Sequence, residues 1–288
     1  MKISIGKHSG FCPGVKRAIR MLDTEIDKYK NDSSINIYTL GEIIHNPKVI
    51  DSYLKKGVKI LKDTDIIGIN DKVVIRSHGV SPKIRENLLK NNIKIVDATC
   101  PFVLRVHELA YKLSRNGYFI VIVGDPNHPE VMGILGNIDG GDFIVAKDKK
   151  SLEHIKNKKK LAVISQTTQS LDLFYSISKE LLGKFDEEIR IFKSICKTTN
   201  LRQKDAIEMA RQNNIVIVVG GKMSANTNHL FELSASIQQH TYHIEDSSEL
   251  KKDWFHDAEE KIAIISGAST PFSDLEDVRK KIESYFRT

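Results

Sequence analysis

Residues 93–105, IKIVDATCPFVLR, join a short β-branched run to a helix-like segment, with Cys100 at the junction. The same arrangement occurs twice more, because KISIG precedes Cys12 and IRIFKSI precedes Cys196. Two of the junctions share the pattern C-P-x-V-x-R, and the three cysteines follow one another at similar intervals. Each cysteine therefore occupies the same point of a threefold internal repeat.

Further landmarks of the repeat follow each cysteine. A strand-like run ends in glycine in all three units, as INIYTLG, YFIVIVG and IVIVVGG. A second run then leads into a polar loop, as VVIRSHGVSP, LAVISQTTQS and IAIISGASTP. Short β-branched runs that alternate with amphipathic segments are typical of βαβ units, which form parallel sheets covered by helices.

These landmarks predict an α/β protein with three small lobes, each with a parallel-type sheet, in a pseudo-threefold arrangement around a central cavity. The predicted lobes are residues 14–99, 100–192 and 193–288, and the N-terminal strand within residues 1–13 completes the third. Ligands of such sheets bind beyond the carboxyl ends of the strands. We therefore expect the cysteines and the polar loops to face the cavity.

The composition excludes several classes of protein. At 40% hydrophobic residues the chain can bury a core, yet no run approaches the roughly 20 apolar residues of a membrane span. The start, MKISIGKHSG, lacks the charged-then-apolar layout of a signal peptide. An odd number of widely spaced cysteines also argues against a disulfide framework. We expect a cytoplasmic protein with no membrane partner.

The net charge of +7 raises the alternative of an RNA-binding protein. Lysines cluster at residues 147–150 and 158–160, but these clusters lie between the landmarks of the repeat. No helix-turn-helix, zinc-finger or stacking-aromatic pattern accompanies them. A lysine-rich solvated surface is the favoured interpretation, and no nucleic-acid partner is expected.

The repeated cysteines, Cys12, Cys100 and Cys196, indicate a metal site with three thiolates. Structural zinc sites usually contain closely spaced C-x₂₋₄-C pairs, which this sequence lacks. A 4Fe–4S cluster normally has four thiolates, so three would leave one iron open to bind substrate as a Lewis acid. A helix that begins at each cysteine would favour the thiolate. A zinc-stabilised binding module and three structural thiols are the alternatives.

The polar strand-end loops indicate an anionic ligand. Their imidazoles, hydroxyls and amides suit phosphate oxygens. These residues are His45, His78, His128, Thr167, Ser224, Asn226 and Ser269. Glu130 adds a carboxyl beside His128, and burial in a secluded pocket would raise its pKa and make it a proton donor. A surface glutamate at a helix N-terminus is the alternative.

Nine motifs resemble the 4-hydroxy-3-methylbut-2-enyl diphosphate reductase family, also called the IspH/LytB family. The resemblance extends from about residue 3 to the end of the chain, and the motifs appear in the family's order. The motifs are GFCPGVKRA, EIIHNP, RSHGVSP, DATCPFV, NHPEVMG, SQTTQS, ICKTTNLRQ, SANTNHL and SGAST. The combination is highly specific.

The resemblance implies an iron–sulfur reductase that catalyses the last step of the non-mevalonate isoprenoid pathway. Such enzymes remove an allylic hydroxyl with two electrons and two protons, and give isopentenyl and dimethylallyl diphosphate. The matching positions imply that Cys12, Cys100 and Cys196 hold one 4Fe–4S cluster with an open iron, that Glu130 delivers a proton, and that Thr167 lies beside the substrate hydroxyl. The positions implied to bind the diphosphate are His45, His78, His128, Ser224, Asn226 and Ser269.

The resemblance also implies an electron donor such as ferredoxin or flavodoxin, while the oligomeric state, monomer or homodimer, is left open. Two positions depart from the family pattern. Ala225 replaces a serine found in some members, and Pro13 replaces an alanine. Neither change affects an implied cluster ligand or Glu130, so we expect activity to persist and the affinity for diphosphate to be the affected property.

Overall fold

The computed structural model describes residues 2–61, 67–153, 155, 158–186, 188–256 and 259–286. Most strands in this part of the chain are followed by a helix. The strands are β1 (Lys2–Ile5), β2 (Ile37–Leu40), β3 (Lys59–Leu61), β4 (Lys72–Ile75), β5 (Lys94–Asp97), β6 (Phe119–Val123), β7 (Phe143–Ala146), β8 (Lys160–Ser165), β9 (Glu188–Ile191), β10 (Ile215–Val219), β11 (Thr241–Ile244) and β12 (Lys261–Ser266). The α-helices are α1 (Pro13–Tyr29), α2 (Pro47–Lys55), α3 (Pro82–Lys90), α4 (Pro101–Arg115), α5 (Pro129–Gly136), α6 (Leu171–Leu182), α7 (Lys197–Gln212), α8 (Ala225–Ala235) and α9 (Phe272–Ser284).

The strands form three four-stranded sheets with the orders β3-β2-β4-β5, β7-β6-β8-β9 and β1-β12-β10-β11. Every pairing within them is parallel. The sequence-based prediction of an α/β protein with three parallel-sheet lobes is therefore confirmed. The lobe boundaries at residues 14, 100 and 193 stay a prediction.

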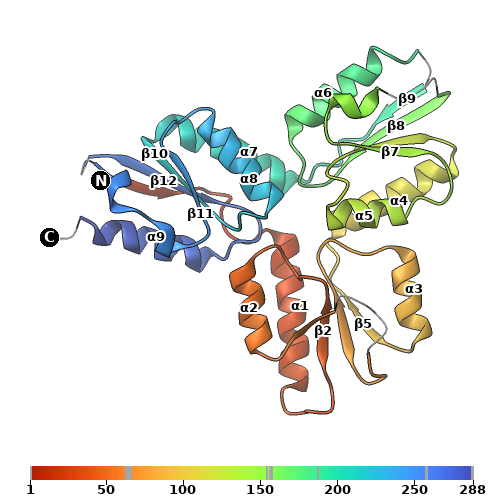
Figure 1. The fold of residues 1–288 in the computed structure, drawn as a ribbon, viewed down its shortest axis with the longest axis horizontal. Helices are drawn as coiled ribbons and strands as arrows, with labels where there is room; N and C mark the ends of the chain where they lie inside the picture. The colour runs from red at the N-terminus through yellow and green to blue at the C-terminus, as the bar shows by residue number, and fades with distance from the viewer. Residues whose placement is uncertain are drawn as a thin grey trace. The chain divides into compact units, whose positions relative to one another are not determined.

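The first strand of the chain belongs to the last sheet. β1 pairs with β12, with Ile3 opposite Ile262 and Ile5 opposite Ile264, and Figure 1 shows this red strand beside blue ones. The contacts between residues divide the chain into two compact units. The terminal unit comprises Met1–Lys16, His45–Val49 and Lys197–Thr288, and the middle unit comprises Arg17–Ile44 and Ile50–Cys196.

Each sheet contains one short edge strand that the sequence did not reveal. These strands are β3, β7 and β11, of three or four residues, and they pair with β2, β6 and β10 respectively. Such short runs carry little periodicity, so they are hard to distinguish from loops by pattern alone.

Helices cover both faces of two of the sheets, with one helix on one face and two on the other. In the second lobe, Phe174 and Ile177 of α6 pack on one face, while Ala110 of α4 and Ile134 of α5 pack on the other. In the terminal unit α9 covers one face and α7 with α8 the other (Figure 1). No helix in the described residues is long and apolar enough to cross a membrane.

Candidate active site

The predicted site residues all follow the carboxyl ends of parallel strands, or begin the helices that come next. This placement results from the βαβ order, which returns every chain segment to the same sheet edge. The middle unit contains His78, Cys100, His128, Glu130, Thr167 and Cys196. The terminal unit contains Cys12, His45, Ser224, Asn226 and Ser269.

Glu130 and Thr167 are in direct contact within the middle unit. Glu130 lies in the first turn of α5 and is only 2% exposed. The Thr167 backbone N–H donates to Oε1 at 2.6 Å, and its hydroxyl donates to Oε2 at 3.0 Å. Burial raises the pKa of Glu130 to about 7, although both hydrogen bonds from Thr167 oppose the rise. A carboxyl with this pKa is suited to donate a proton at neutral pH.

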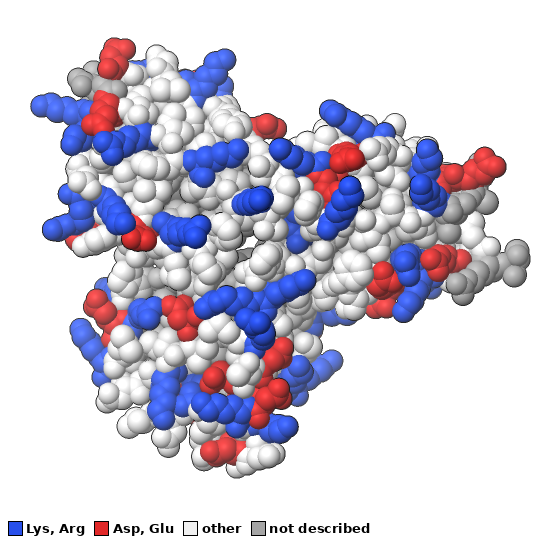
Figure 2. Space-filling view, turned by 180° about the vertical axis from the view of Figure 1, so that it is seen from behind, with Lys and Arg blue, Asp and Glu red and all other residues white. Residues whose placement is uncertain are grey.

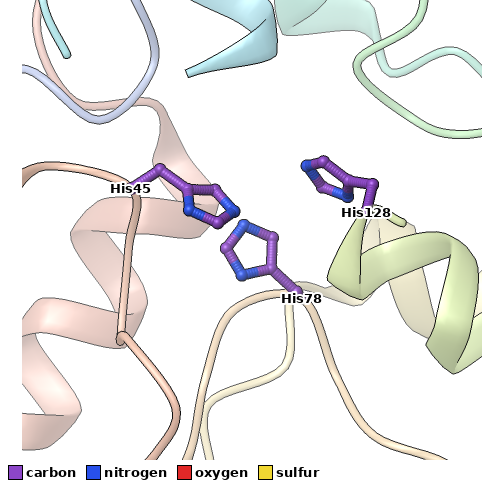
Figure 3. A group of neighbouring side chains, drawn as sticks. All are labelled: His45, His78 and His128. Carbon is purple, nitrogen blue, oxygen red and sulfur yellow. The ribbon is translucent and has the colours of Figure 1, made fainter. Parts of the chain in front are cut away.

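His128 forms the N-cap of α5. Its Nδ1 accepts a hydrogen bond from the Glu130 backbone N–H at 3.1 Å. In the neutral ring this contact leaves the proton on Nε2, where it can be donated. The ring meets that of His78 edge-on, with centroids 5.5 Å apart and an interplanar angle of 84° (Figure 3). Two neighbouring imidazoles of this kind offer N–H donors to an anion.

Thr167 also links Glu130 to a cysteine. Its carbonyl accepts a hydrogen bond from the Cys196 N–H at 2.9 Å, while its own N–H donates to Glu130. Cys100 is held in a similar way, because its N–H donates to the Ser77 carbonyl at 2.9 Å, one residue before His78. Each cysteine loop of the middle unit is thus joined through backbone hydrogen bonds to a loop that carries a predicted site residue.

All three cysteines directly precede a helix, as the sequence predicted. Cys100 is the N-cap of α4, and α1 and α7 begin at Pro13 and Lys197. The thiols are half-buried. The Sγ of Cys12 accepts a hydrogen bond from the Val15 N–H at 3.4 Å, and no acidic residue occupies the first turn of the three helices. The N-terminal ends of three helices therefore lie beside the three sulfur atoms.

In the terminal unit, Ser269 and Asn46 hold the loop of His45. The Ser269 hydroxyl donates to the His45 carbonyl at 2.8 Å, and the Asn46 Nδ2 donates to the Ser269 carbonyl at 2.9 Å. Asn46 Oδ1 also accepts from the Val49 N–H at the start of α2. The Cys12 N–H donates to the carbonyl of the residue before Ser269, so three motifs of this unit are joined.

The first turn of α8 presents polar groups suited to a ligand. Ser224 is the N-cap and accepts from the Thr227 N–H, which leaves its own hydroxyl hydrogen available. Asn226 is 7% exposed, and its Nδ2 has no hydrogen-bond partner among the described residues. A buried amide without a partner is uncommon and indicates a missing ligand or water. Ala225, between them, is exposed.

Sequence reasoning missed residues that support the loops. Arg202 of α7 is 4% exposed and donates to the carbonyls of Ser266, Gly267 and Gly10, so it joins two motif loops. Asn46 has a comparable role beside His45. Both occur inside quoted motifs, NLRQ and EIIHNP, and a charged residue on the sheet-facing side of α7 was the available signal.

A family model described as "LytB protein" matches residues 3–283. The chain belongs to the LytB family. Relatives named 4-hydroxy-3-methylbut-2-enyl diphosphate reductase include one from Geobacter sulfurreducens, 40% identical over 99% of this chain and 98% of the relative. Another, from Aquifex aeolicus, is 37% identical over 98% of this chain and 96% of the relative. The LytB family is thus a family of oxidoreductases, which confirms the family predicted from the motifs.

Solved structures of LytB-type reductases share the fold. One, described as (E)-4-hydroxy-3-methyl-but-2-enyl diphosphate reductase, the terminal enzyme of the non-mevalonate pathway, is 36% identical with a TM-score of 0.73 and covers 98% of this chain and 99% of its own. The Plasmodium falciparum reductase is 27% identical with a TM-score of 0.88, and the match covers 98% of this chain and 87% of the reductase chain.

Membership of the LytB family favours neither of the two non-enzymatic alternatives, the zinc-binding module and the RNA-binding protein. The surface charge agrees with this. On the face shown in Figure 2, Lys and Arg side chains are distributed among Asp and Glu side chains. Lys158, in one of the lysine clusters, pairs with Asp142 at 2.6 Å.

Proposed function

We propose that this chain reduces 4-hydroxy-3-methylbut-2-enyl diphosphate to isopentenyl and dimethylallyl diphosphate. The observation that carries the proposal is the buried Glu130 carboxyl, with a pKa of about 7, held by Thr167 in a member of a reductase family. The reaction breaks the allylic C–O bond, takes up two electrons and two protons, and releases water. A buried, readily protonated acid meets the need for a proton at the departing oxygen.

In this proposal Glu130 donates the proton and Thr167 sets its position. The two hydrogen bonds from Thr167 fix both carboxylate oxygens, so the acidic proton is presented from one defined group. Burial keeps water away from the carboxyl and maintains the raised pKa. The Thr167 hydroxyl can rotate and accept as well as donate, which allows it to follow the change in charge of Glu130.

We further propose that Cys12, Cys100 and Cys196 hold a 4Fe–4S cluster. The donor set fits such a group, because each thiol lies immediately before a helix and the Cys12 sulfur accepts a helix N–H. When bound, such a cluster supplies electrons and one Lewis-acidic iron that lacks a protein ligand. A one-electron carrier such as ferredoxin or flavodoxin is the expected donor.

The substrate's diphosphate would be bound by the polar groups of the strand-end loops. His78 and His128 offer imidazole N–H groups in the middle unit, while Ser224 and Asn226 offer a hydroxyl and an unsatisfied amide in the terminal unit. His45 and Ser269 complete the proposed set, although the Ser269 hydroxyl already donates to the His45 carbonyl. Neutral donors at helix N-termini are well suited to phosphate oxygens.

Metal analysis followed by an activity assay tests the proposal. Protein purified without oxygen is expected to contain about four iron and four acid-labile sulfide per chain. With a reduced viologen dye and the allylic diphosphate, it should release both five-carbon diphosphates. Zinc in place of iron, or a full cluster without turnover of this substrate, would contradict the proposal.

A further inference from the structure

His107 is a buried histidine that the proposed reaction does not use. It lies on α4 and is 5% exposed. Burial lowers its pKa to about 4, against the opposing effect of Asp97, so the ring is neutral near pH 7. Its Nε2 has no hydrogen-bond partner among the described residues. A buried polar atom without a partner lowers stability, so the burial of this ring calls for an explanation other than hydrogen bonding.

The ring fills the space between two glycines of different segments. A Cβ placed on Gly79 would lie 2.7 Å from the His107 Cε1, and one placed on Gly133 would lie 2.9 Å from Nε2. Real side chains do not approach so closely, so both positions exclude a side chain while the imidazole is present. Gly79 also has a φ of 74°, a left-handed conformation that favours glycine.

These glycines adjoin two proposed active-site residues. Gly79 directly follows His78, and Gly133 lies one turn after Glu130 on α5. The contact continues along the same helix face, because a Cβ on Gly136 would lie 2.2 Å from the Ser81 Cβ. The loop that carries His78 therefore rests directly on the helix that carries Glu130.

A third segment contacts the same place. A Cβ on Gly79 would lie 2.9 Å from the Thr99 Cγ2, so Thr99 is packed beside the His107 ring, one residue before Cys100. The Thr99 N–H donates to Asp97 Oδ1 at 3.0 Å, and Asp97 is also bonded to Arg85. His107 and this network border a pocket of about 310 Å³. The imidazole is thus enclosed by the segments of His78, Glu130 and Cys100.

We propose that His107 is a positioning residue, whose compact flat ring sets the separation between the His78 loop and the Glu130 helix. This inference rests on the proposed function for its catalytic consequence, but not for its structural one. A smaller side chain lets the loop and α5 shift toward each other, and a larger one forces them apart. Displacements of about 1 Å in such groups can lower rates by about 100-fold.

A pair of glycine substitutions tests the proposal. Gly133→Ala places a methyl against the ring, and we expect kcat/KM to fall by about tenfold or more. His107→Ala opens the space that this methyl needs, so the double variant should recover part of the activity lost in Gly133→Ala. Gly136→Ala is the matched control, since its methyl meets Ser81 instead and His107→Ala should give no recovery. If the losses of kcat/KM in Gly133→Ala and His107→Ala simply added in the double variant, the proposal would be overturned.

A second comparison separates positioning from general destabilisation. Leu113→Ala truncates a core residue of the same helix away from the junction, in the lobe's α4–α5 core. Compared with Leu113→Ala, both His107→Ala and the milder His107→Asn should raise KM and lower kcat together. They should also shift the imidazole NMR signals of His78 and His128, which the core truncation leaves in place. Kinetic constants equal to those of Leu113→Ala, together with unshifted His78 and His128 signals, would overturn the proposal.

The NMR comparison does not depend on turnover. If the wild-type protein fails to reduce the allylic diphosphate, the proposed function is wrong, whereas shifted His78 and His128 signals in the His107 variants still establish the positioning role. If the wild type is active and the signals do not move, the function stands and the role of His107 is refuted.

Discussion

Both carboxylate oxygens of Glu130 accept hydrogen bonds from the single residue Thr167, at 2.6 Å from its backbone N–H and 3.0 Å from its hydroxyl. These bonds stabilise the charged carboxylate, yet the pKa of Glu130 is raised because burial outweighs them. The pair brings together two sequence motifs, NHPEVMG and SQTTQS, that are far apart in the chain. It therefore joins the Glu130 carboxyl to the loop whose Thr167 carbonyl accepts a hydrogen bond from the Cys196 N–H.

Replacing Glu130 by Gln should abolish most turnover while the protein stays folded. Gln keeps an oxygen for the Thr167 N–H and can donate its amide to the Thr167 hydroxyl, so the local structure is retained. Loss of the general acid should lower kcat by about 10² to 10⁴-fold. Anaerobic steady-state kinetics and iron content measure the effect, and near-normal kcat with normal iron would remove Glu130 from the mechanism.

The pH dependence of kcat should report the protonation of Glu130. The acid form is the donor, so kcat is expected to be constant at low pH and to fall about tenfold per unit above pH 7, the region of its raised pKa. Thr167→Val removes a hydrogen bond that lowers this pKa, so the falling limb should move to higher pH. Thr167→Ser, which keeps the hydroxyl, is the control and should leave the limb unmoved.

The same carboxyl makes stability depend on pH. The folded pKa of about 7 lies above the unfolded value of 4.5, so the folded state binds the proton more tightly. The free energy of unfolding therefore loses a contribution as pH rises from 4.5 to 7. Relative to wild type, Glu130→Gln should become more stable across this window, by roughly 3 kcal/mol at most.

Chemical unfolding at several pH values measures that difference. Glu108→Gln is a suitable control, because a hydrogen bond from Lys112 lowers the pKa of Glu108. Its protonation therefore affects stability only below pH 4.5. Its stability difference from wild type should be flat between pH 5 and 8. A flat difference for Glu130→Gln as well would show that this carboxyl keeps an ordinary pKa.

Cys196→Ser, like the matching changes of Cys12 and Cys100, should lose most of the iron. Serine retains the size of the side chain but not the thiolate that iron–sulfur clusters require. Iron, sulfide and visible absorbance of anaerobically purified protein give the result. Ser194→Ala, two residues earlier in the same loop, controls for disturbance of the loop. Full iron in any of the three cysteine variants would refute a cluster held by these thiolates.

Ala225→Ser should lower KM for the diphosphate substrate with little change in kcat. The added hydroxyl lies at the first residue of α8, between Ser224 and Asn226, where helix N–H groups favour anions. One hydrogen bond to a charged group is worth about 1.5–3 kcal/mol, so KM could fall about tenfold or more. Ala235→Ser, at the other end of α8, should change nothing. An unchanged KM for Ala225→Ser would place the diphosphate away from this turn.

Local sequence patterns predicted part of this molecule well. The β-branched runs around Val121, Val163 and Val218 are long enough to show strands, and each cysteine lies directly before a helix, as expected. The edge strands β3, β7 and β11 escaped detection because three or four residues carry no clear period and no repeated motif follows them, as the cysteine motifs follow β1, β5 and β9. His107 escaped because nothing in its local sequence distinguishes a ring packed against Gly79 and Gly133 from any other helix residue.

By itself the sequence determined the repeated βαβ order, the parallel sheets, the placement of cysteines and polar loops at strand ends, and the family. These properties depend on short-range periodicity and on motifs, which are readable along the chain. Only the tertiary structure decided that Thr167 bonds Glu130 and that the His107 ring lies between the His78 loop and α5. Those facts depend on burial and contact between distant segments, and burial is what moves a pKa and fixes a distance.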